Sequence, residues 1–289
     1  MDYSHLRSTA QGLLLCNATH FDLAQTLDCG QSFRWQPCGN DTNVYDGFAA
    51  NRHLRIRRIG NDLLFEKTTL QEFEAFWKNY FDLERDYSEL QHQLRQDETL
   101  RRAVAFAPGI RVLRQDPWEA LCSFILSQNN NVMRIKGIVA RLCASFGSPV
   151  EGGYTFPSPD RLAACDLDAL ASVRCGFRAK YILDAARKVS SGALQLQPLY
   201  TLPIDAARAQ LTGIYGVGPK VANCVLLYGF GRAECVPVDI WMSRALAQWY
   251  PNGLPKTLAP VAGIAQQYLF HYARCCPDAV EKKTALPEK

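Results

Sequence analysis

The sequence predicts an α+β fold with a β-rich first part and a mostly helical second part. Residues from about Leu13 to Phe65 form short alternating apolar stretches separated by turn residues. After Asp116 the chain carries repeated helix-start signals joined by short connections. A length of 289 residues is sufficient for two domains, or for one large domain, with a buried core.

The first part contains the clearest strand pattern. Gly-Asn-Asp sequences at residues 39–41 and 60–62 predict turns between strands. The run His53–Arg57 alternates with period two, so its two apolar residues share one face and its two arginines the other. We interpret those arginines as a solvated sheet face. A helix is predicted over Leu70–Phe81, and its aromatic residues at helical spacing are expected in the core: Phe73, Phe76, Trp77 and Tyr80.

In the second part, N-cap residues mark the starts of several predicted helices. Asp116 is an N-cap acid followed by Pro117 at the first helical position and Glu119 three residues after the cap. Ser158 opens another helix in a similar way. Further helices are predicted over Arg178–Val189, Pro203–Gln210, Pro219–Tyr228, Asp239–Trp249 and Thr257–Arg274, and the chain beyond Asp278 is expected to be frayed.

Composition excludes several classes of protein. Apolar residues make up 48% of the chain and charged residues 21%, which is ordinary for a globular protein. No stretch approaches the ~20 apolar residues of a membrane span, and the N-terminus lacks the pattern of a secretory signal. The net charge of +4 is compatible with a polyanionic partner without indicating one.

The eleven cysteines are expected to be reduced thiols, mostly buried as small apolar groups. Cys275 and Cys276 are adjacent, and no CxxC pair occurs in the sequence. This spacing argues against a zinc site and against an iron–sulfur cluster.

The segment Leu211–Lys220 has the pattern of a helix, a tight glycine turn and a second helix. Glycines at 213, 216 and 218 permit positive φ and close approach of the backbone. Ile214 and Val217 are expected to insert into the core. The N–H groups that open the second helix then form an anion site that suits a phosphate. A turn without a ligand is the alternative.

Lys220 is electrostatically misplaced, because the helix dipole disfavours a cation at the N-terminus. It is either a phosphate contact or an amine nucleophile able to form a Schiff base. Asp239 lies in "VPVDIW" at the start of the next helix. Its simplest role is an N-cap, and near a reactive lysine it could also stabilise developing positive charge.

Four further segments extend this pattern into a family resemblance. Leu211–Asp239 resembles the helix-hairpin-helix and Gly/Pro…Asp signature of base-excision DNA glycosylases. "CGQSFRW", "QDPWEALCSFILSQNNNVMRI", "CGFRAKY" and "AGIAQQYLF" resemble the 8-oxoguanine DNA glycosylases, in the family's order and over nearly the whole chain. The resemblance implies a mixed α/β domain over 1–115, with an antiparallel sheet and a helix, packed on a mostly α-helical helix-hairpin-helix glycosylase domain over 116–280, with a tail over 281–289. It also implies extrusion of the damaged base from double-stranded DNA.

The resemblance assigns the reaction and the base pocket. Lys220 falls on the catalytic lysine, which attacks C1′ and leaves a Schiff base from which β-elimination cuts the strand. Asp239 falls on the catalytic aspartate. Gly30 is expected to offer its carbonyl to the N7–H of 8-oxoguanine, where guanine has an acceptor instead. Gln266 corresponds to the reader of the Watson–Crick edge, and the ring is expected between Phe270 and Cys224.

The opposite strand is assigned to other residues. Asn129 corresponds to the residue that fills the vacated space, and Arg134 and Arg178 to donors for the estranged cytosine. Phe177 corresponds to the wedge in the kinked duplex. Gly216 and Gly218 are expected to approach the phosphates. Without the resemblance, residues 129–131 read as a polar loop, Phe270 as core and Cys224 as a small buried thiol.

Two departures from the family pattern stand at the DNA side. Trp241 takes the place of a histidine, and Phe177 that of a tyrosine, which affects pocket shape and affinity. No cofactor is expected; a sodium, potassium or calcium ion on hairpin carbonyls would be structural. We expect a monomer in a bacterial cytoplasm. The alternatives are a glycosylase for another lesion and a non-catalytic helix-hairpin-helix DNA-binding protein.

Overall fold

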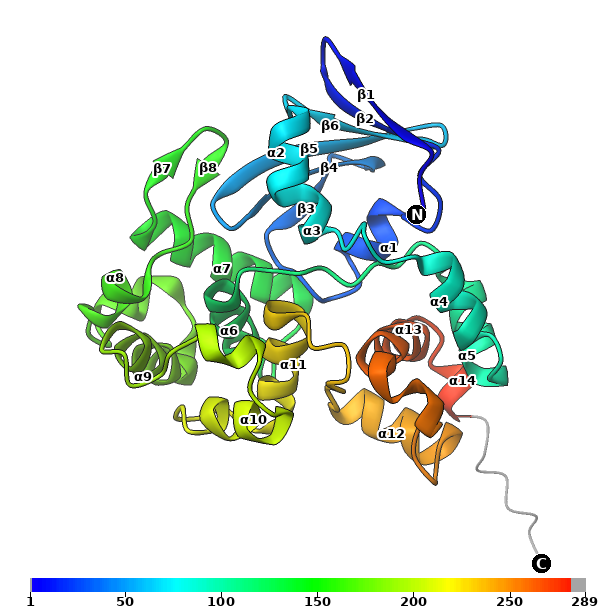
Figure 1. The fold of residues 1–289 in the computed structure, drawn as a ribbon. Coiled ribbons are helices and arrows are strands. Elements are labelled where there is room, and N and C mark those ends of the chain that lie inside the picture. The colour runs from blue at the N-terminus through cyan, green and yellow to red at the C-terminus, as the bar shows by residue number, and fades with distance from the viewer. Residues whose placement is uncertain (1, 282–289) are drawn as a thin grey trace, which may run out of the picture.

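The computed structural model describes residues 2–281 and contains one large antiparallel sheet beside a mostly helical part (Figure 1), which confirms the predicted fold class. The sheet has the strand order β1-β2-β6-β5-β4-β3. Its first strand precedes the stretch in which strands were predicted. The strands are β1 (His5–Thr9), β2 (Gly12–Cys16), β3 (Trp35–Cys38), β4 (Asp41–Ala49), β5 (Arg52–Ile59) and β6 (Asp62–Glu66).

The two faces of β5 follow the predicted alternation. Leu54 and Ile56 are buried in the core of the sheet domain. Arg55 and Arg57 lie on the opposite face, where both pair with Glu66 of β6 at 3.8 and 3.1 Å. The interpretation of these arginines as a solvated sheet face is therefore confirmed.

One helical segment covers the core of the sheet together with α1 (Leu23–Leu27). It consists of α2 (Leu70–Glu72), a π-helical turn over Phe73–Trp77 and α3 (Lys78–Tyr80). Phe73, Trp77 and Tyr80 are buried, as predicted, whereas Phe76 is only partly buried against the same core. The Trp35 indole donates to the Tyr80 hydroxyl at 2.8 Å. The π-helical turn was not predicted.

Helices α4 (Tyr87–Leu94) and α5 (Glu98–Phe106) precede the predicted boundary at residue 115 but pack with the helices that follow it. The Gln91 amide donates to the Tyr268 hydroxyl at 3.1 Å, and Figure 1 shows both helices beside α13. The division of the chain at 115/116 and at 280/281 stays a prediction, and residues 282–289 of the predicted tail lie outside the described residues.

In the helical part, helices begin directly after the predicted N-caps. The Asp116 carboxylate accepts from the Glu119 N–H at 2.9 Å, and Ser158 caps the next predicted start. The helices are α6 (Pro117–Leu126), α7 (Val132–Phe146), α8 (Pro159–Ala163), α9 (Ala179–Ser190), α10 (Ile204–Thr212), α11 (Pro219–Phe230), α12 (Ile240–Trp249), α13 (Ala262–Cys275) and α14 (Asp278–Glu281), with a small hairpin of β7 (Pro149–Val150) and β8 (Gly153–Tyr154) after α7.

The predicted helix over Thr257–Arg274 is correct only in its second half. Residues Lys256–Val261 form a 3-10 helix that contains Pro260, and α13 begins at Ala262. A proline inside an α-helix removes a backbone hydrogen bond and clashes with the preceding turn, which explains the break. Within residues 2–281, no helix is both long enough and apolar enough to cross a membrane.

Candidate active site and DNA interface

The glycine turn between α10 and α11 has the predicted shape. Ile214 and Val217 are 2% and 5% exposed, so they anchor the turn in the core. Gly216 has φ of +78°, and a Cβ there would lie 2.5 Å from the Tyr181 ring. The turn is also held by the Tyr215 N–H, which donates to Asp184 at 2.7 Å. Gly218 precedes α11 with open space around its Cα.

Lys220 lies in the first turn of α11 and is half-buried. Its Nζ is 3.4 Å from the Ser127 Oγ at the end of α6 and 5.6 Å from the centroid of the Phe124 ring. The amine is therefore held against the end of α6, two residues before Asn129.

Asp239 caps α12, with Oδ1 accepting from the Met242 N–H at 2.8 Å. Asp239 and Lys220 are both close enough to the buried Cys224 thiol to affect its pKa. Burial raises the pKa of Cys224, Lys220 partly offsets this through its charge and a hydrogen bond, and the Asp239 carboxylate raises it further. The three side chains therefore share one electrostatic environment, although Asp239 is nineteen positions after Lys220 (239 − 220) in the sequence. One carboxylate oxygen is not used by the cap.

Residues 28–31, which we call the Gly30 loop, lie against α13. Gly30 has φ of +92°, and a Cβ there would lie 3.1 Å from Nη1 of Arg274 and 3.8 Å from the Phe270 ring. Gln266 is one turn before Phe270 on α13 and is only 3% exposed. Its Oε1 is buried and finds no hydrogen-bond partner among the described residues. A buried acceptor without a donor is rare and suits a group that receives a ligand.

The loop between α6 and α7 carries the asparagines of the predicted opposite-strand site. Asn129 is exposed with φ of +47°, and Asn131 caps α7 by accepting from the Arg134 N–H at 2.9 Å. The Arg134 side chain is exposed near this loop, and its charge adds to burial in lowering the pKa of Arg178.

Arg178, which was expected to donate to the estranged cytosine, is buried and already makes hydrogen bonds within the protein. It is 3% exposed and donates from Nε to the Gln128 carbonyl at 2.7 Å and from Nη2 to the Asn129 carbonyl at 2.9 Å. The guanidinium is thus hydrogen-bonded to the backbone of the asparagine loop.

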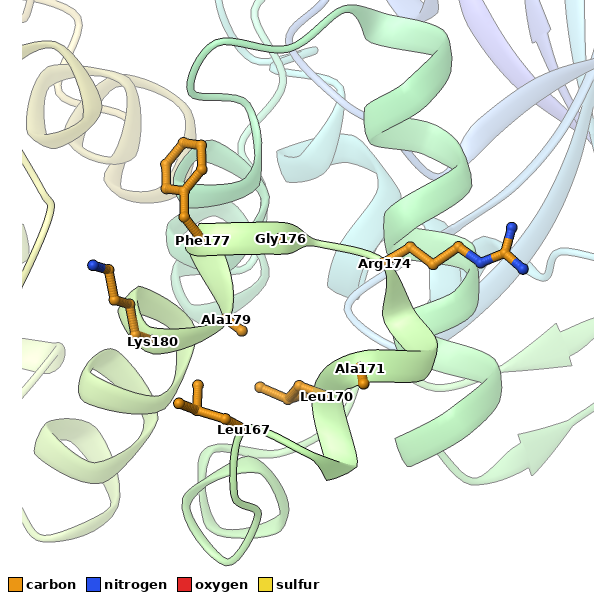
Figure 2. A pocket seen from close by; sticks show the side chains of 8 residues that line it. All are labelled: Leu167, Leu170, Ala171, Arg174, Gly176, Phe177, Ala179 and Lys180. Carbon is orange, nitrogen blue, oxygen red and sulfur yellow. The ribbon is translucent and has the colours of Figure 1, made fainter.

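Phe177 and Trp241 are large apolar side chains at the surface, 49% and 41% exposed. Phe177 lies at the rim of a pocket of about 530 Å³ lined by Leu167 and Leu170, and Figure 2 shows its ring pointing away from those leucines. The Arg178 guanidinium is 4.4 Å from the Phe177 ring centroid. Trp241 lies in the first turn of α12, with the Arg244 guanidinium 6.0 Å from its ring.

No metal centre is evident in the part of the chain that the structure describes, where no three His, Cys, Asp or Glu side chains form a group able to hold an ion. All eleven cysteines are free, and most of them are buried, as predicted.

Sequence reasoning missed the side chains that support the predicted site. Asp28 and Arg274 beside Gly30 lie outside the motif segments, whereas Ser127 beside Lys220 lies inside "QDPWEALCSFILSQNNNVMRI" without any property that marks it there. Gln31 lies inside the "CGQSFRW" segment and was therefore within reach of the motif analysis.

Comparison with known proteins agrees with the two parts of the chain. Residues 13–121 match the family "8-oxoguanine DNA glycosylase, N-terminal domain", and residues 122–257 match "HhH-GPD superfamily base excision DNA repair protein". The N-glycosylase/DNA lyase of Saccharomyces cerevisiae is 31% identical over 83% of this chain and 71% of its own length.

Two solved structures are similar along nearly the whole chain. MBOgg1 in complex with a low-affinity DNA ligand is 40% identical with a TM-score of 0.90, covering 96% of this chain and 100% of that one. The 8-oxoguanine glycosylase/lyase of Clostridium acetobutylicum, in complex with double-stranded DNA containing cytosine opposite 8-oxoguanine, is 34% identical with a TM-score of 0.89 and the same coverage. This chain therefore belongs to the 8-oxoguanine DNA glycosylase family of the HhH-GPD base-excision repair superfamily.

Proposed function

We propose that Lys220 forms the Schiff base through which this DNA glycosylase and abasic-site lyase excises 8-oxoguanine, and that the lesion is recognised opposite cytosine. The observation that carries this proposal is the shared environment of Lys220, Asp239 and Cys224 at the start of α11 and α12. An amine at the start of α11 and a carboxylate at the start of α12, both close enough to Cys224 to affect its pKa, are the parts that a lysine-dependent glycosylase requires.

In the proposed reaction the lone pair of the Lys220 amine forms a bond to C1′ of the lesion as the bond from C1′ to the base breaks. The base leaves with the electron pair and takes up a proton. Opening of the sugar at O4′ leaves a protonated Schiff base between Nζ and C1′. Loss of a proton from C2′ then expels the 3′ phosphate and cuts the strand. The Asp239 carboxylate stabilises the positive charge that develops on the sugar.

Base recognition is proposed for the space between the Gly30 loop and α13. The Gly30 carbonyl would accept from N7–H of 8-oxoguanine, and it would face a lone pair on guanine. Gln266 would read the Watson–Crick edge, which supplies a donor for its buried Oε1. Phe270 and Cys224 would enclose the ring; burial keeps the thiol neutral at physiological pH because it raises the Cys224 pKa.

The opposite strand is proposed to meet Asn129, Arg134 and Arg178 at the estranged cytosine. For Arg178 this requires release of the two loop carbonyls that it now holds. Phe177 would wedge into the duplex. Trp241 and the glycines at 216 and 218 would lie along the phosphates, where the N-terminus of α11 favours an anion.

No cofactor is proposed. A structural sodium, potassium or calcium ion on hairpin carbonyls, a monomeric state and a bacterial cytoplasmic location beside the nucleoid also stay proposals. Phosphate contacts should make DNA binding weaken steeply with salt.

The test is borohydride trapping on duplexes that carry 8-oxoguanine opposite cytosine, comparing the wild type with Lys220→Gln. Borohydride reduces a Schiff base to a stable covalent adduct. We expect an adduct with the wild type and none with Lys220→Gln. Lys180→Gln is the matched control, because it removes an exposed lysine beside Tyr181 and Tyr215 and should leave the adduct intact.

Two outcomes would contradict the proposal. Base release without an adduct would make water the nucleophile and would reduce Lys220 to a phosphate contact. Binding of the duplex without base release would point instead to another lesion, or to a non-catalytic DNA-binding protein.

A further inference from the structure

Asp28 joins three distant elements at a point two residues before Gly30. Its Oδ1 accepts from Lys136 of α7 at 2.7 Å, and its Oδ2 accepts from the Tyr45 hydroxyl of β4 at 2.5 Å. Its backbone carbonyl accepts from Nη2 of Arg274 on α13 at 3.1 Å. The start of the Gly30 loop is therefore tied to the sheet, to the helix that follows the asparagine loop and to the helix that carries Gln266.

The other end of the loop is fixed by Gln31, which is fully buried. Its Nε2 donates to the carbonyls of Thr26 and Arg111 at 2.8 and 2.7 Å, and its Oε1 accepts from the Leu113 N–H at 2.9 Å. Cys29 between the two anchors is also fully buried. Gly30 is thus half-buried between two fully buried residues of a loop that is held on both sides.

We propose that Asp28, through Lys136 and Arg274, positions the Gly30 carbonyl and thereby sets the selectivity for 8-oxoguanine over guanine. This inference rests on the function proposed above. The two bases differ at N7 by a donor against an acceptor, so selectivity depends on a carbonyl that cannot retreat from the mismatch. A displacement of about 1 Å at such a site can cost on the order of a hundredfold in rate.

Arg274 strengthens the link between the anchor and the base pocket. Its guanidinium lies 5.7 Å from the Phe270 ring centroid, while Nη1 lies beside Gly30. One side chain therefore borders both the loop and the ring proposed to stack on the base. Asp28, Lys136 and Arg274 act here as positioning residues.

A purely stabilising ion pair is the competing explanation, and the chain offers a matched pair to test it. Lys78 pairs with Glu74 at 2.8 Å, and its side chain is 21% exposed, against 2.7 Å and 16% for Lys136 with Asp28. The Lys78 pair lies on the helical segment that covers the sheet. Lys136→Met and Lys78→Met therefore remove the same kind of contact at different places.

The experiment measures single-turnover excision of 8-oxoguanine and of guanine opposite cytosine, together with cleavage of a preformed abasic site. For Lys136→Met we expect the ratio of the two excision rates to fall roughly tenfold or more, with abasic cleavage unchanged. Lys136→Arg should restore the ratio, and Lys78→Met should not alter it. Asp28→Asn is a second variant that keeps the side-chain shape, so the inference stays testable if Lys136→Met folds poorly.

Unchanged selectivity in Lys136→Met and Asp28→Asn would overturn the inference and leave the proposed function intact. An equal loss of excision and of abasic cleavage would also overturn it, because a general structural role affects both steps. A wild type that releases no 8-oxoguanine would refute the proposed function, and the inference with it.

Discussion

The catalytic segment and the Gly30 loop are built in opposite ways. The glycine turn, Lys220 and Asp239 all fall within residues 211–239, and buried apolar side chains at 214 and 217 anchor the turn. The Gly30 loop is held by polar contacts across great sequence distances, 108 positions to Lys136 and 246 to Arg274. The proposed chemistry is thus encoded locally, whereas the proposed recognition is assembled by the fold.

The largest expected effect tests the catalytic side of this comparison. Asp239→Asn keeps an N-cap side chain but removes the charge, so excision of 8-oxoguanine should fall about a hundredfold while stability changes little. Asp239→Ala should lose the cap as well, at a further cost of about 1 kcal/mol in the free energy of unfolding. Single-turnover excision and urea unfolding measure the two effects. Wild-type excision by Asp239→Asn would limit this residue to capping.

The same contrast explains how much the sequence could predict. Caps such as Asp116 and Asp239 are local, because a side chain and an N–H three residues later decide them. Among the anchors of Gly30, the pairing of Asp28 with Lys136 could not be predicted, because the two residues are 108 positions apart and only the fold brings them together. Arg178 shows a third case: its position was predicted, but not its burial beneath the asparagine loop, which depends on the fold around it.

The second prediction concerns the stability that Gln31, the buried anchor of the Gly30 loop, contributes to the protein. Gln31→Leu leaves two buried backbone groups without a partner, at Arg111 and Leu113, and leaves the Thr26 carbonyl with the Cys29 thiol as its donor. We expect a loss of about 3 kcal/mol in the free energy of unfolding. Gln36→Leu on β3 is the control, since that side chain is exposed and its replacement should change stability by less than about 0.5 kcal/mol. Equal unfolding midpoints for the two variants would show that Gln31 does not anchor the loop.

A third prediction compares two glycines within the catalytic turn. Gly216→Ala places a Cβ against the Tyr181 ring at a φ of +78°, so we expect a loss of about 2 kcal/mol in stability. Gly218→Ala meets open space and has φ of −98°, so its stability should be close to that of the wild type. Thermal unfolding of both variants without DNA provides the measurement. A stable Gly216→Ala would mean that the turn does not depend on the close approach of Tyr181.

The last prediction is a pH dependence of stability on the recognition side. Burial, and then repulsion by Arg274, lower the pKa of His271 from its ordinary value of 6.5 to about 4. The unfolded chain therefore binds this proton more readily than the native protein. The stability that the neutral imidazole contributes is fully present above about pH 6.5 and is lost as the pH falls towards 4.

His271→Gln removes this titration, so the stability difference between wild type and variant should shrink as the pH falls from 6.5 to 4. Above pH 7 the difference should stay constant, because His271 is then neutral in both the folded and the unfolded chain. Urea unfolding across this range measures it, and parallel curves would contradict the buried, neutral state. Because Arg274 contributes to the shift, Arg274→Gln should raise the pKa of His271 towards 6.5, so that less stability is lost between pH 6.5 and 4. Arg274, which also donates to the backbone of the Gly30 loop, thus has a pH-dependent readout in stability.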